Sequence, residues 1–141
     1  MRAQLGRVGH DPREPACRIR RHIRQARAME LDHLPALADQ LLAAAREAAS
    51  GRAAQSIRSG RDVQLRQTVM ALTRGHGLDD HVAPGEATLQ VLVGRVALRW
   101  SREEQAIELA AGDWIDLPDA RHALDAETDA VVLLTVSVRQ R

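Results

Sequence analysis

The 141-residue sequence contains no phenylalanine and no tyrosine, and its only aromatic residues besides histidine are two tryptophans. Its single cysteine, Cys17, excludes an internal disulfide framework and a zinc site built from several thiolates. The scarcity of aromatic rings argues against a surface that stacks the bases of single-stranded nucleic acid. Lysine is missing as well, so all 20 basic residues are arginines.

Long apolar runs are also absent. The run from Ala130 to Leu134 is far shorter than the roughly 20 residues of a transmembrane helix. The N-terminus lacks the apolar stretch of a secretory signal. We therefore expect no membrane partner and a reducing, cytoplasmic location. The remaining composition, 45% apolar and 28% charged residues, is ordinary for one globular domain.

Charge is distributed unevenly along the chain. Eight arginines against two acids give residues 1–28 a net charge of +6, and twelve arginines against seventeen acids give residues 29–141 a net charge of −5. The basic arm at 1–28 is interpreted as a solvated, disordered tail or as sequence upstream of a true start at Met29. A helical extension and a polyanion-binding arm are the alternatives. Nucleic acid is not the expected partner, because the sequence shows no helix-turn-helix.

A single amphipathic helix is predicted over residues 33–49. Asp32 is the expected N-cap, Pro35 falls in the first turn, where its missing N–H has no consequence, and Gly51 is expected to end the helix. The apolar residues recur at helical spacing and form one stripe. They are Leu34, Leu37, Leu41, Ala45 and Ala48.

From about residue 62 the apolar residues alternate with a period of two, and short segments recur every 8–12 residues, which predicts a mainly β barrel or sandwich. Residues 29–61 are interpreted as the helix and a linker, and 62–138 as the barrel. The run 130–138 is apolar on both faces, as expected of a central strand. The other predicted strands are 87–93, 95–100, 105–109, 114–117 and 121–126.

Two histidines follow glycines at spacings along the sequence that are typical of a conserved motif. Gly75 precedes His81 by six residues, and Gly112 and Pro118 precede His122. His122 shares a strand face with Leu124, and that face is apolar, so its side chain is expected to point inward.

These spacings resemble the two motifs of the cupin family, the small, single-domain conserved β-barrels of the RmlC-like jelly-roll type. The resemblance covers roughly residues 62–138, with Gly94 at the closing glycine of the first motif and a one-residue deletion before His122. It implies a cupin-type jelly-roll β-barrel, here with an N-terminal α-helix, that forms a homodimer. Metal-dependent cupins resemble one another in a site of three histidines and one carboxylate.

The metal motif is degenerate in this chain. The second histidine of the first motif falls on Ala83 and the glutamate on Ala87, while the closing asparagine of the second motif is Ala126. Only His81 and His122 match, whereas catalytic metal sites usually have three protein ligands. We therefore expect no cofactor, with a divalent metal held by His81 and His122 as the alternative.

Four side chains are candidates for a third ligand. Glu86 is one residue out of register, so its side chain would point to the opposite face of the strand. His76 lies between two glycines in a turn and is expected to be exposed. The other two candidates are Asp79 and Asp80.

Side-chain alternation predicts the rest of the pocket. Leu89 and Val91 share a face with position 87, and Leu124 shares a face with His122. The predicted ligand pocket is therefore aliphatic, with His81 and His122 as its polar points, as suits a small, largely apolar molecule.

The sequence thus predicts a small-molecule-binding or sensing cupin domain without a complete metal site, rather than an enzyme. One alternative is a metal-dependent cupin enzyme, of dioxygenase or isomerase type, that uses His81 and His122. The other alternative is a regulator whose basic arm binds nucleic acid.

Overall fold

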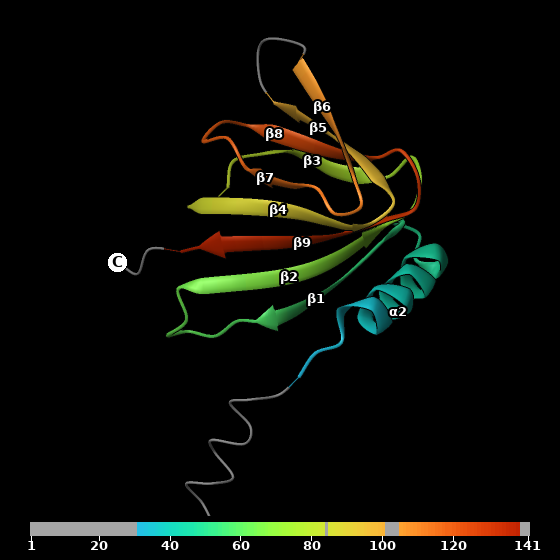
Figure 1. Cartoon of the computed structure of the whole chain (residues 1–141), viewed down its shortest axis with the longest axis horizontal. Helices are drawn as coiled ribbons and strands as arrows, with labels where there is room; N and C mark the ends of the chain where they lie inside the picture. Colours follow the sequence, from blue (N-terminus) through green and yellow to red (C-terminus); the bar gives the residue numbers. More distant parts are fainter. Residues whose placement is uncertain (1–30, 84, 101–104, 139–141) are drawn as a thin grey trace, which may run out of the picture. The chain divides into compact units, whose positions relative to one another are not determined.

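The computed structural model describes residues 31–83, 85–100 and 105–138. The chain divides into two units, Met1–Asp32 and His33–Arg141, and the second holds every helix and strand described below. Within the described residues it contains the helix α2 (Leu34–Glu47) and nine strands (Figure 1). The strands are β1 (Arg52–Arg58), β2 (Leu65–Leu72), β3 (Gly77–His81), β4 (Glu86–Val93), β5 (Arg95–Trp100), β6 (Gln105–Ala110), β7 (Trp114–Asp116), β8 (His122–Ala126) and β9 (Ala130–Ser137).

Helix α2 lies where the sequence predicts a helix, but its N-cap is different. His33, not Asp32, is the N-cap, and the His33 Nδ1 accepts a hydrogen bond from the backbone N–H of Ala36 at 3.4 Å. An imidazole can replace a carboxylate here because capping requires only an acceptor directed at a free amide. The helix ends at Glu47, and Gly51 lies beyond it with a φ of 64° in the turn that leads into β1.

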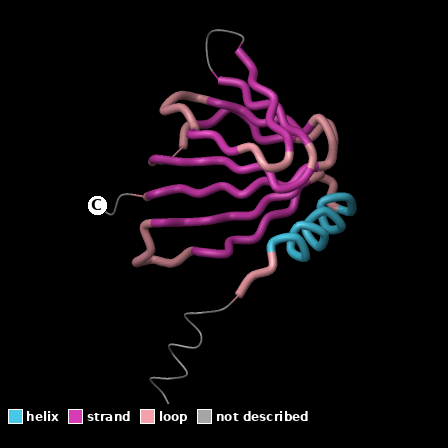
Figure 2. Tube along the Cα trace, in the orientation of Figure 1, coloured by secondary structure: helices cyan, strands magenta, loops and turns pink. Residues whose placement is uncertain are grey.

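The strands form two antiparallel sheets that face each other (Figure 2). The five-stranded sheet has the order β1-β2-β9-β4-β7, and the four-stranded sheet has the order β3-β8-β5-β6. The prediction of a mainly β jelly-roll barrel with an N-terminal helix is confirmed. Strand β1 lies before the predicted barrel range of 62–138, in residues that the sequence analysis takes for a linker. Its side chains are mostly exposed, as on the edge of a sheet, so it lacks the buried alternation that identifies a strand.

Each face of the five-stranded sheet packs against a different partner. On one face, Val69 of β2 and Val131 of β9 lie in a buried cluster with Leu37 and Leu41 of α2. On the other face, Val132 of β9 lies in the core between the two sheets. Strand β9 is therefore apolar on both faces because it is central and covered on both sides, as predicted for this run.

The core between the sheets consists of aliphatic side chains and fills most of the barrel interior. Seven of the large residues in the protein are almost completely buried. They are Leu72, Leu98, Val69, Val91, Val96, Val131 and Val132. None of the described helices is long and apolar enough to cross a membrane.

Asp129 connects helix α2 to the turns of the barrel. Its Oδ2 accepts hydrogen bonds from the Arg46 guanidinium of α2, with the Nη2–Oδ2 distance at 2.9 Å, and its Oδ1 accepts from the backbone N–H of Arg74 at 3.0 Å. The Arg74 amide and then the Arg46 guanidinium hold the pKa of the Asp129 carboxyl below its usual value. The ionised carboxylate is therefore the form that joins the helix to the barrel.

Replacing Asp129 with asparagine should lower the free energy of unfolding by roughly 1 kcal/mol at neutral pH, since the ion pair is partly exposed. Because the folded-state pKa lies below the unfolded one, the stabilisation is present above the unfolded value of about 4 and is lost as the pH falls through the folded value. Urea unfolding of both proteins at pH 7 and below pH 4 measures this. The exposed Asp116→Asn is the matched control and should change stability little; an equal loss in both variants would contradict the assignment.

Candidate functional site

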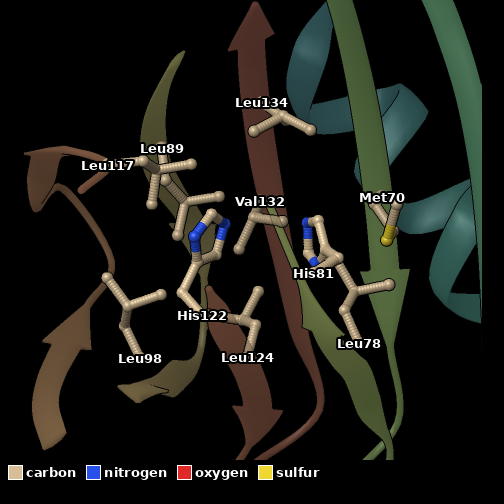
Figure 3. Close-up of a pocket in the computed structure, with 10 residues that line it drawn as sticks. All are labelled: Met70, Leu78, His81, Leu89, Leu98, Leu117, His122, Leu124, Val132 and Leu134. Carbon is tan, nitrogen blue, oxygen red and sulfur yellow. The ribbon is translucent and has the colours of Figure 1, made fainter. Parts of the chain in front are cut away.

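A narrow pocket opens between the two sheets, lined by two imidazoles and eight aliphatic or thioether side chains (Figure 3). Its volume is about 20 Å³, which is room for about one water molecule. Both sheets and the segment after β7 contribute to the lining. The lining residues are Met70, Leu78, His81, Leu89, Leu98, Leu117, His122, Leu124, Val132 and Leu134.

The two histidines meet because β3 and β8 pair antiparallel, with His81 directly opposite His122. A register shift between Leu78 and His81 is needed for this arrangement. Residues three apart on a regular strand point to opposite faces, whereas an irregularity of this kind allows both side chains to line the pocket. The two ring centroids lie 4.7 Å apart, with the ring planes tilted by 58°.

Gly77 allows β3 to lie this close to β8. A Cβ atom at this position would collide with the backbone oxygen of Leu124. The absence of a side chain at Gly77 therefore permits the strand pairing that carries His81.

Each imidazole is hydrogen-bonded through Nδ1 to the backbone carbonyl two residues before it. The His81 Nδ1 lies 2.8 Å from the carbonyl oxygen of Asp79, and the His122 Nδ1 lies 2.9 Å from the carbonyl oxygen of Ala120. A carbonyl oxygen can only accept a hydrogen bond, so Nδ1 is the protonated nitrogen in both rings. The neutral rings therefore keep a lone pair on Nε2, at the tip of each side chain.

The two rings differ in burial. His122 is 2% exposed, whereas His81 is exposed on its strand. Trp100 of β5 is the cross-strand neighbour of His122 on its other side and packs against the core. His122 therefore forms the inner part of the pocket, and His81 forms its solvent-facing part.

Four of the five predicted pocket residues lie around this pocket. These are His81, His122, Leu89 and Leu124. Val91 is on the predicted face of β4 but lies two residues farther along, fully buried in the core. Whether the pocket binds a ligand stays a prediction.

Six lining residues are not predicted from the sequence. Met70, Val132 and Leu134 belong to β2 and β9, and which face of these strands meets the histidines depends on the strand order. Leu117 belongs to the predicted strand 114–117, but it lies just beyond the end of β7 at Asp116. The other two missed residues are Leu78 and Leu98.

The residues present do not fit the metal site of three histidines and one carboxylate that metal-dependent cupins share. Ala87 is buried with no ligating atom at the position of the glutamate, and Glu86 is exposed, on the alternate side of β4. In the described part of the chain, no group of three histidine, cysteine or acidic side chains could hold a metal ion. His76 is exposed as predicted, and its Nδ1 is 2.9 Å from Thr73 Oγ1.

An ion pair joins β5 to β8 beside the site. Arg99 Nε donates to the Asp125 carboxylate, and this hydrogen bond raises the pKa of Arg99 further. Both side chains are about half exposed, so the pair contributes little to stability. Neither side chain lines the pocket, whose electrostatics are set by the two imidazoles.

Comparison with known proteins identifies the fold. The chain matches no protein-family model and no curated protein. Among solved structures, an RmlC-like cupin from Shewanella frigidimarina is 17% identical, with a TM-score of 0.56 over 67% of this chain and 83% of that one. A cupin 2 conserved barrel domain protein from Leptotrichia buccalis is 27% identical, with a TM-score of 0.54 over 61% of this chain and 40% of that one.

A third similar structure has no assigned activity. It is a conserved protein of unknown function from Streptococcus pyogenes, 23% identical, with a TM-score of 0.58 over 67% of this chain and 80% of that one. The described part of the chain therefore has the fold of an RmlC-like cupin barrel, preceded by one helix.

Proposed function

We propose that this cupin domain binds or senses a small molecule in the pocket between its sheets, with His81 and His122 as the polar contacts. The observation that carries the proposal is the pair of imidazoles, each held through Nδ1 by a backbone carbonyl and each lining the same pocket. A few fixed polar groups in an otherwise apolar pocket are typical of small-molecule sites.

The size of the pocket limits the ligand. Small-molecule pockets usually measure on the order of 300–1,000 Å³, whereas this one has about 20 Å³. The ligand is therefore very small, or it displaces lining side chains that are only partly buried. Met70 and Leu134 are such side chains on the five-stranded sheet, and a methionine adapts readily because it is unbranched.

Replacing either pocket histidine should abolish ligand-induced stabilisation. We expect small alcohols, amides and ketones that raise the melting temperature of the wild type to have no effect on His81→Ala or His122→Ala. His76→Ala is the matched control, since His76 is an exposed histidine outside the pocket. Thermal unfolding with and without each compound provides the measurement. If the two pocket variants respond as the control does, the ligand site lies elsewhere.

We expect no near-stoichiometric divalent metal in the purified protein, because two imidazoles without a third ligand hold such ions weakly. Elemental analysis of untagged wild type, beside the His81→Ala, His122→Ala double variant, tests this. Stoichiometric iron, manganese, nickel or zinc that disappears in the double variant would favour the metal-dependent enzyme instead.

We further propose that the protein is a homodimer, as the resemblance to small cupins implies. Helix α2 already covers its own five-stranded sheet, so it is not free to cover the sheet of a partner. If the protein is a dimer, light scattering gives twice the chain mass of 15.5 kDa. A mass of one chain at micromolar concentration would contradict the dimer.

A further inference from the structure

The pocket combines two hydrogen-bond acceptors with no donor. We infer that its ligand is a small, neutral alcohol or diol whose O–H groups donate to the Nε2 atoms of His81 and His122. This inference rests on the proposed function and specifies the chemical class of the ligand.

The acceptor character follows from the backbone. Because the carbonyls of Asp79 and Ala120 take the Nδ1 protons, the neutral rings can offer only a lone pair at Nε2. Rotating a ring to reverse this arrangement would break a hydrogen bond of 2.8 or 2.9 Å. His122, at 2% exposure, would also have to turn within the core.

The protein supplies no donor from the rest of the pocket lining. The eight other lining residues are leucines, one valine and one methionine, none of which has a side-chain N–H or O–H group (Figure 3). A ligand that displaces solvent from these nitrogens has to replace the hydrogen bonds that solvent donates to them. The donors must therefore come from the ligand.

The spacing of the rings favours two donors over one. The ring centroids lie 4.7 Å apart, and both imidazoles come from paired strands of the four-stranded sheet, so a short diol with neighbouring hydroxyls can direct one hydroxyl to each ring. An alcohol satisfies one ring only. A ketone offers a further acceptor to two existing ones, and a carboxylate adds a negative charge that nothing in the lining neutralises.

The size of the pocket requires the lining to adapt to a head group of this kind. A volume of about 20 Å³ holds about one water-sized group, so both hydroxyls enter only when a partly buried side chain such as Met70 moves aside. His81 is exposed, so the aliphatic part of a ligand can extend past it toward solvent. The head group therefore determines specificity, and the chain length should matter less.

A series of four-carbon compounds tests the inference. We would titrate 1,2-butanediol, 1-butanol, 2-butanone and butanoate into the full-length protein at pH 8. NMR shifts of the His81 and His122 rings and of the Met70 methyl report binding in the pocket. Affinity should fall about tenfold from diol to alcohol and again from alcohol to ketone, with no binding of butanoate.

The tautomers can be measured in the free wild type without any variant. Long-range ¹⁵N–¹H correlation spectra should show the Nδ1–H form for both His81 and His122, with the remaining histidines as references. An Nε2–H form in either ring would overturn the inference, because that ring would then donate to the ligand.

Variants show which atoms distinguish the compounds. His81→Phe keeps a planar ring at the exposed position and removes its acceptor, so the advantage of the diol over the alcohol should vanish while 1-butanol still binds. His122→Phe is the second variant, and circular dichroism checks its fold. His76→Phe should leave the whole series unchanged.

The outcomes separate this inference from the proposed function. If 2-butanone or butanoate binds in the pocket as tightly as the diol, the donor requirement is wrong, although the pocket remains a ligand site. If none of the four compounds shifts the pocket resonances, while compounds without O–H groups give histidine-dependent stabilisation, the inference alone falls. If no compound of either kind acts through His81 and His122, the proposed function falls with it.

Discussion

The burial of both faces of strand β9 is the constraint on which the rest of this fold depends. Val131 packs against helix α2 on one side, and Val132 packs in the core between the sheets on the other. The same strand pairs with β2 and β4 along almost its whole length, so it holds the centre of the five-stranded sheet. Strand β9 also supplies Val132 and Leu134 to the pocket lining, so the backbone on this side of the site is fixed by strand pairing at both edges.

On the four-stranded sheet, the site depends on the pairing of β3 with β8. The register shift before His81 and the absence of a side chain at Gly77 allow the two imidazoles to lie side by side. The carbonyls of Asp79 and Ala120 then determine which nitrogen carries the proton. A barrel of the cupin type that has alanine at two ligand positions thus has two oriented acceptors in an apolar pocket, and the proposed small-molecule site rests on this arrangement.

Much of this architecture could be predicted from local patterns. The spacing of Gly75, His81, Gly112 and His122 indicated a cupin barrel, and alternation placed Leu89 and Leu124 on the face of the pocket. Strand β1 was missed because an exposed edge strand leaves no apolar alternation. The N-cap was assigned to Asp32 because a carboxylate is a stronger capping residue in general, whereas the chain turns so that the imidazole of His33 reaches the Ala36 amide.

The sequence by itself determined the type of fold, the inward faces of β4 and β8 and the absence of the metal ligands, because these follow from side-chain period and residue identity. Only the tertiary structure decided which strands lie together, how Leu78 and His81 both line the pocket, and that the volume is small. Strand order and register depend on contacts between residues far apart in the chain. The tautomers of His81 and His122 depend on the backbone geometry two residues before each ring, which no pattern of side chains specifies.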